Sequence, residues 1–222
     1  EYSDAIASDI KLNVKPKSQG CSLAGDKAFF CRYVVNYLLQ DESLGATAER
    51  RNAAIKRGGL KVITTLNPEA QTVAKQAVDS TQPAATNWND VNSALTSVEP
   101  GTGRVIAMAQ NTELGSPADA NDHSKTEYNY NVDSAYGGTR GFQPGSTFKA
   151  IVLAEWLKTG HSAGYTVNAS APKNYPPYTF TVSCDPKRAA DPWPVHNVAG
   201  TNAGVMTVRE ATKQSINAGF TE

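Results

Sequence analysis

Residues 148–157 are apolar on nearly every side when the sequence is drawn as a helix. A helix of this kind is typical of a domain interior, whereas a surface helix keeps one polar face. Pro144-Gly145 breaks the chain just before the helix, and Gly160 follows it as a stop signal. The sequence therefore predicts a helix buried inside a folded domain.

A serine and a lysine three residues apart, Ser146 and Lys149, stand at the beginning of this helix. Helix residues i and i+3 have about 5–6 Å between their Cβ atoms, so the amine can reach the hydroxyl. The ordinary lysine pKa is about 10.4, and burial and the positive end of the helix dipole both lower it. A neutral Lys149 would be the general base that activates Ser146 for acyl transfer. The alternative is an N-cap serine followed by a lysine that extends into water.

Two other Ser-x-x-Lys patterns occur, Ser8 with Lys11 and Ser170 with Lys173. Ser8 lies in a charged, mixed stretch, and Pro172 removes a hydrogen bond that a helix would need. Neither pair is expected to be held at a fixed geometry. The sequence therefore favours the pair that opens the apolar helix.

Ser215-Ile216-Asn217 is the one Ser-x-Asn pattern in the sequence. Thr207 and Glu210 fit a capping box, which predicts a short helix that ends at about Gln214. Ser215 then lies at a junction between helix and loop, where a hydroxyl and an amide can project into a cleft. The alternative is a polar C-cap without a chemical role.

In this order the patterns resemble the transpeptidase domain of penicillin-binding proteins, specifically the bifunctional class A kind. The resemblance covers about residues 58–222, and it rests on the order and spacing of motifs that are individually weak. The matching segments are 59–66, 98–108, 144–149, 204–211 and 215–217. It implies an α+β fold of the penicillin-binding transpeptidase or β-lactamase type, with an antiparallel sheet that carries helices on both faces.

The domain organisation follows from the same resemblance. Residues 1–57 are expected to be a linker region after an upstream glycosyltransferase domain, and residues 58–222 the N-terminal part of the transpeptidase domain. Alternation predicts a strand over 60–66, and segments 93–98 and 104–109 read as a hairpin. Asn67 as N-cap and Pro68 at the first helical position predict a helix between this strand and the hairpin. Its core stripe is Ala70, Val73, Ala74, Ala77 and Val78.

The family's third signature, Lys-Thr-Gly or Lys-Ser-Gly, lies on a sheet strand after the Ser-x-Asn motif. Lys158-Thr159-Gly160 has these letters but closes the helix that Ser146 opens, so we interpret it as a helix terminator. The chain is therefore expected to be a fragment with an incomplete sheet. The remainder of the transpeptidase domain would come either from a second polypeptide or from a part of the same chain that is not shown, and we favour the second polypeptide.

The resemblance implies D,D-transpeptidation of peptidoglycan stem peptides, with β-lactams trapped at Ser146. Ser146 would attack the penultimate D-Ala carbonyl with Lys149 as base, and Ser215 would relay the proton to the leaving amine. Asn217 would bond the substrate amide or hold Lys149. The implied location is the extracytoplasmic face of the bacterial cell membrane, with an anchoring helix upstream of this chain. A serine β-lactamase and a non-enzymatic β-lactam sensor or scaffold are the alternatives.

The composition speaks against several other classes of partner. Twenty-one basic and 21 acidic residues balance to a net charge of zero without forming a block, which excludes a typical nucleic-acid-binding protein. No cofactor is expected. The three histidines, His123, His161 and His196, show no ligand spacing with the cysteines, so no metal site is expected either.

Cys21 and Cys31 bracket a short polar turn, and a disulfide between them would stabilise the segment by about 2–4 kcal/mol. Two buried thiols are the alternative, and Cys184 could pair with a cysteine beyond Glu222. Tyr178 and Trp193 lie in a long loop rich in Pro and Tyr and are candidates for substrate contact. Ordinary packing is the interpretation that we favour for these two aromatic residues.

Overall fold

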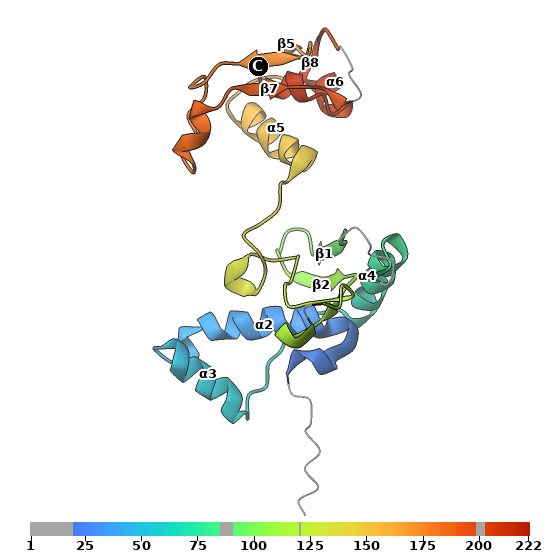
Figure 1. Cartoon of the computed structure of the whole chain (residues 1–222), viewed down its shortest axis with the longest axis vertical. Helices are drawn as coiled ribbons and strands as arrows, with labels where there is room; N and C mark the ends of the chain where they lie inside the picture. Colours follow the sequence, from blue (N-terminus) through green and yellow to red (C-terminus); the bar gives the residue numbers. More distant parts are fainter. Residues whose placement is uncertain (1–19, 85–90, 120, 199–202) are drawn as a thin grey trace, which may run out of the picture. The chain divides into compact units, whose positions relative to one another are not determined.

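The computed structural model describes residues 20–84, 91–119, 121–198 and 203–222. The chain divides into two compact units, Glu1–Phe142 and Gln143–Glu222, shown in Figure 1. The expected domain boundary at residue 58 falls within the first unit. No helix of the described segments is long and apolar enough to cross a bilayer.

In its described segments, the first unit combines three α-helices with short strands and 3₁₀ turns. Its helices are α2 (Ala28–Gln40), α3 (Ala48–Arg57) and α4 (Pro68–Thr81), and its strands are β1 (Ala94–Val98), β2 (Val105–Gln110), β3 (Glu113–Leu114) and β4 (Lys125–Thr126). Strands β1 and β2 form an antiparallel hairpin, whereas β3 and β4 pair in parallel. The 3₁₀ turns are η1 (Cys21–Lys27), η2 (Glu42–Leu44), η4 (Pro117–Asp119) and η5 (Ser134–Tyr136).

Helix α4 begins as predicted, because Asn67 accepts hydrogen bonds from the backbone N–H groups of Glu69 and Ala70 at 3.0 and 3.1 Å. Ala74 and Val78 of the predicted stripe are buried against Ala107 and Ala109 of β2. Val73 is 59% exposed, so the stripe is narrower than predicted. Small side chains on both elements allow the helix and the strand to approach closely.

The predicted hairpin is confirmed, with Ala94 opposite Gln110 and Val98 opposite Val105. The predicted strand over 60–66 is wrong, since these residues form no strand. Hydrogen bonds to β2 come from the end of the segment, where the Thr65 hydroxyl donates to the Val105 carbonyl and the Asn67 N–H donates to the Ile106 carbonyl. Alternation gave the wrong answer because it reports which side chains could share a face, and a strand also needs a row of backbone partners.

A buried amide joins α4, β2 and the N-terminal turn. Gln71 has no exposed surface, and its side chain accepts from the Met108 N–H at 2.8 Å and donates to the Met108 carbonyl at 3.0 Å. It also donates to the Asp26 carbonyl at 2.6 Å. Asp26 lies between Cys21 and Cys31, which form a disulfide. One side chain therefore satisfies backbone groups of two other elements where water has no access.

The described residues of the second unit, 143–198 and 203–222, form two α-helices and four short strands. Its elements are η6 (Gly145–Thr147), α5 (Phe148–Lys158), β5 (Thr166–Asn168), β6 (Lys173–Tyr175), η7 (Pro186–Ala190), β7 (Trp193–Val195), β8 (Val205–Thr207), α6 (Val208–Lys213) and η9 (Asn217–Phe220). Strand β5 pairs with β8, and β6 pairs with β7, both antiparallel. The α+β class is confirmed, with the described strands divided among four two-stranded sheets.

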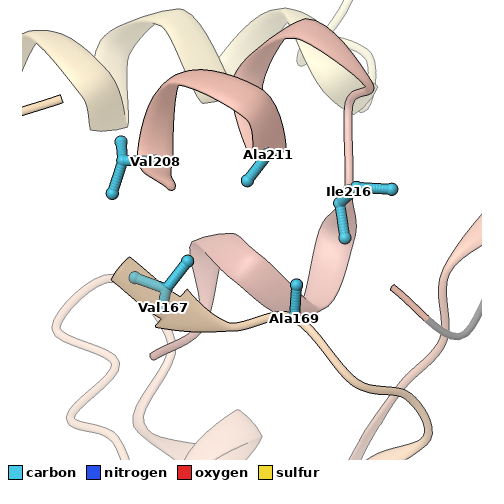
Figure 2. Close-up of a cluster of buried hydrophobic side chains, with 5 residues drawn as sticks. All are labelled: Val167, Ala169, Val208, Ala211 and Ile216. Carbon is cyan, nitrogen blue, oxygen red and sulfur yellow. The ribbon is translucent and has the colours of Figure 1, made fainter. Parts of the chain in front are cut away.

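The core of the second unit is a cluster of five buried side chains, drawn in Figure 2: Val167, Ala169, Val208, Ala211 and Ile216. Leu153 and Trp156 of α5 pack against this cluster. The prediction that α5 is buried is wrong for the described structure, since Phe148 is 50% and Ile151 is 61% exposed. The described elements of this unit cover one side of α5, so its other apolar side chains stay in contact with solvent.

We expect Gln71→Leu to lower the free energy of unfolding by about 2–3 kcal/mol, because it leaves buried backbone groups of Met108 without partners. Chemical denaturation followed by circular dichroism measures the change. Val73→Ala is the matched control on the same helix, and at an exposed position it should change stability by less than about 0.5 kcal/mol. A Gln71→Leu protein as stable as this control would contradict the role of the amide.

Candidate active site

Ser146 lies in the 3₁₀ turn η6, directly before α5, and Lys149 is the second residue of the helix. The Lys149 ammonium nitrogen is 3.2 Å from the Ser146 hydroxyl oxygen. The predicted reach over three residues is therefore realised. Ser146 is exposed to solvent, which leaves its oxygen open to a substrate.

Ser215 occupies an unusual backbone conformation after α6. Thr207 caps the helix by accepting from the Glu210 N–H at 3.2 Å, as the capping box predicts. The helix ends at Lys213, and Ser215 then takes a φ of 54°, in the left-handed region that few non-glycine residues adopt. Such conformations cost about 1–3 kcal/mol and cluster at functional sites. The turn places both the carbonyl and the hydroxyl of Ser215 beside Lys149.

Four oxygen atoms surround the Lys149 nitrogen. Besides Ser146 Oγ, they are the Ser215 carbonyl at 2.7 Å, Ser215 Oγ at 3.0 Å and Asn217 Oδ1 at 2.6 Å. Ser215 Oγ lies 3.0 Å from Ser146 Oγ. The four residues named from sequence are thus brought together within the second unit, and each side chain is in hydrogen-bond contact with another.

The orientation of the Asn217 amide is set by the residue that follows β7. Asn217 Nδ2 donates to the His196 carbonyl at 2.7 Å, so its oxygen is the atom that faces Lys149. Sequence reasoning missed the role of His196. No sequence signal could have found it, because every residue carries the same backbone carbonyl and only the fold decides which one lies beside Asn217.

Burial lowers the pKa of Lys149 below its ordinary value. The Phe220 ring, 5.8 Å from the nitrogen, acts in the opposite sense, because an aromatic face attracts a cation. A neutral amine has two N–H donors and one lone pair. The Ser215 carbonyl and Asn217 Oδ1 can only accept, so they engage the two donors and leave the lone pair for a hydroxyl proton. In its neutral form, Lys149 would therefore be oriented to accept the proton of Ser146.

Tyr178 and Trp193 line a different hollow of about 360 Å³ in the loop between β6 and β7. Its walls also include Phe180 and Arg188, and none of the four clustered polar residues lines it. Tyr178 is 75% and Trp193 is 49% exposed, and the Trp193 ring packs against the rings of Tyr175 and Phe180. Trp193 begins the strand that leads to His196.

The Lys158-Thr159-Gly160 sequence lies at the end of α5. The helix ends at Lys158, and Gly160 takes a φ of 90° that suits a glycine after a helix. Cys184 is exposed and has no disulfide. Within the described segments, no three His, Cys, Asp or Glu side chains gather as a metal site would require.

No protein-family model matches the sequence. Two curated relatives are penicillin-binding proteins 1A. The one from Mycobacterium tuberculosis is 29% identical over 169 residues, which is 73% of this chain and 15% of the relative. The one from Mycolicibacterium smegmatis is 26% identical over 162 residues, 73% of this chain and 16% of the relative. Over 73% of its length, this chain is therefore similar to mycobacterial penicillin-binding proteins 1A.

Solved structures agree with this relationship. The structure of the penicillin-binding protein PonA1 from Mycobacterium tuberculosis is similar with a TM-score of 0.52 and 25% identity, over 85% of this chain and 38% of PonA1. A structure of PonA1 in complex with penicillin V has a TM-score of 0.53 and 24% identity, over 85% of this chain and 40% of PonA1. The described α+β fold is therefore similar to part of the fold of the penicillin-binding protein PonA1.

We expect Lys149 to titrate below the ordinary lysine value of about 10.4, because burial disfavours its charged form. Folded stability then rises with pH between the folded and the unfolded pKa of this group, where the unfolded chain binds more protons. Carbon NMR of lysine labelled at Cε measures the titration. Lys149→Arg identifies the signal by its loss, and a Lys149 midpoint at or above the ordinary value would contradict the prediction.

Proposed function

We propose that this chain carries the nucleophile and the proton-transfer groups of a serine D,D-transpeptidase that cross-links peptidoglycan stem peptides. The observation that supports it is the placement of the Lys149 nitrogen between Ser146 Oγ and the oxygens of Ser215 and Asn217. The relationship to penicillin-binding proteins 1A supports the same choice among acyl-transfer reactions. Residues 1–57 and 58–222 keep their proposed roles as linker region and transpeptidase part.

Acylation would begin when Lys149 takes the Ser146 hydroxyl proton and the oxygen attacks the penultimate D-Ala carbonyl carbon. A tetrahedral oxyanion forms, with the Ser146 N–H proposed as one of its donors. As the peptide C–N bond breaks, the nitrogen of the terminal D-Ala needs a proton. Ser215 Oγ, which contacts both Lys149 and Ser146, can pass it on and regain one from Lys149. Free D-Ala leaves and an ester on Ser146 remains.

Deacylation would follow the same route in reverse. An amine of a neighbouring stem peptide attacks the ester carbonyl and loses a proton through the Ser215 and Lys149 pair. The C–O bond to Ser146 breaks, the serine regains its proton, and the new amide is the cross-link. A β-lactam follows the first half only, since its amine leaving group stays attached to the acyl part. We place this chemistry at the extracytoplasmic face of the bacterial membrane.

The complete transpeptidase domain, formed by this chain with its expected remainder, should form a penicillin adduct of one molecule per domain, detected by intact-mass spectrometry. Ser146→Ala should abolish the adduct, and Lys149→Met should slow its formation by about 100-fold or more, because a positioned base contributes about 10²–10⁴. Ser80→Ala, on α4 of the first unit, is the control that should acylate at the wild-type rate.

The same experiment separates the alternative functions. Absence of an adduct on the wild type would refute Ser146 as the nucleophile. Rapid turnover of penicillin would indicate a serine β-lactamase. A stable adduct without exchange of the terminal D-Ala of a stem pentapeptide for a labelled D-amino acid would indicate a sensor or scaffold. An adduct together with that exchange supports the transpeptidase.

We further propose that the faces of Tyr178 and Trp193 contact the substrate outside the reacting bond. Tyr178→Ala should then raise the KM for the stem peptide several-fold and leave the acylation rate by a small penicillin within about twofold. Tyr165→Ala is a matched control, because Tyr165 is a similarly exposed tyrosine outside this hollow, at 58% against 75% for Tyr178. Equal KM values in the wild type and Tyr178→Ala would mean that the aromatic residues serve packing alone.

A further inference from the structure

The 3₁₀ turn η9 that carries Asn217 is held by side chains from other elements. Ala218, which follows Asn217, is fully buried. Its N–H donates to Asn197 Oδ1 at 2.9 Å, and its carbonyl accepts from Lys173 Nζ at 3.0 Å. Both polar groups of this residue are therefore engaged by side chains that are distant in sequence.

These side chains belong to the ribbon of β6 and β7 and the residues after it. Lys173 and Tyr175 are two positions apart on β6, so they point to the same face of the strand. The Tyr175 hydroxyl donates to the Thr221 carbonyl at 2.6 Å. On the paired strand, Lys173 lies opposite Val195, and the chain continues into His196, whose carbonyl holds the Asn217 amide.

The Lys173 side chain is held in place by contacts with Glu222 and with the Ala218 carbonyl. Its side chain is only 14% exposed, and its nitrogen lies 2.5 Å from a carboxylate oxygen of Glu222. A cation that is mostly buried keeps its position when a partner neutralises it and a second of its three donors is also used. Here that donor is aimed at the backbone directly after Asn217.

We propose that Lys173 is a positioning residue for the acyl-transfer reaction. Through the Ala218 carbonyl it fixes the backbone that follows Asn217, and thereby the direction in which Asn217 Oδ1 meets the Lys149 nitrogen. A shift of this oxygen redirects the two donors of the neutral amine and turns its lone pair away from Ser146. This inference rests on the proposed function, because it concerns the rate of the serine acylation step.

The test separates binding of penicillin from acylation in the intact protein by stopped-flow kinetics at several penicillin concentrations. Lys173→Met should lower the acylation rate constant about tenfold and leave the dissociation constant of the non-covalent complex within about twofold. Lys173→Arg keeps the cation and should recover most of the rate. Lys213→Met removes an exposed lysine with one ion pair on α6 and is the control that should keep both constants.

A merely structural role predicts a different pattern. It would lower the unfolding temperature of Lys173→Met but leave the acylation constant of the folded protein unchanged, and this result would overturn the proposal. If Lys173→Met does not fold, Tyr175→Phe takes its place, since it removes one hydroxyl and keeps the ring. An acylation constant reduced about threefold in Tyr175→Phe would then support the ribbon as a frame, and an unchanged one would refute it.

The outcome for the wild type keeps the two proposals apart. A wild type that forms no penicillin adduct refutes the proposed function. A wild type that acylates, with Lys173→Met equally fast, refutes only the positioning role.

Discussion

The Lys149 nitrogen is the point on which the second unit depends. It joins the start of α5 to the turn after α6 through oxygens of three residues, Ser146, Ser215 and Asn217. An amine in this place is partly withdrawn from water, which lowers its pKa, and it is also surrounded by acceptors. In the proposed reaction, the same contacts that hold the two segments together would also decide where the proton of Ser146 goes.

Local sequence patterns predicted those parts of the site that depend on helix geometry. Ser146 and Lys149 meet because three residues make nearly one helical turn, and Ser215 follows a helix whose cap was visible as Thr207 and Glu210. The carbonyl of His196 could not be predicted, because backbone groups carry no residue signature. The contact of Lys173 could not be predicted either, because its acceptor is the backbone carbonyl of Ala218. Sequence context instead marked Lys173 as part of a chance Ser-x-x-Lys pattern.

In the fold, too, local features were predictable from the sequence, whereas features that depend on a distant packing partner were not. The start of α4 was predictable because Asn67 and Pro68 act on their own helix. The burial of α5 and the strand over 60–66 were not, because each depends on what lies opposite in space. Ile151 remains 61% exposed although its sequence neighbours are apolar, since burial requires a partner surface as well as an apolar side chain.

The contacts of Lys149 with Ser215 span 66 residues of sequence, and those of Ser146 with Ser215 span 69. Contacts of such separation form only after a long loop has closed, and loop closure is the slow, entropically opposed part of folding. Serine reactivity of the proposed kind is absent from the unfolded chain for this reason. A labelled β-lactam added during refolding would therefore count the molecules in which this loop has closed.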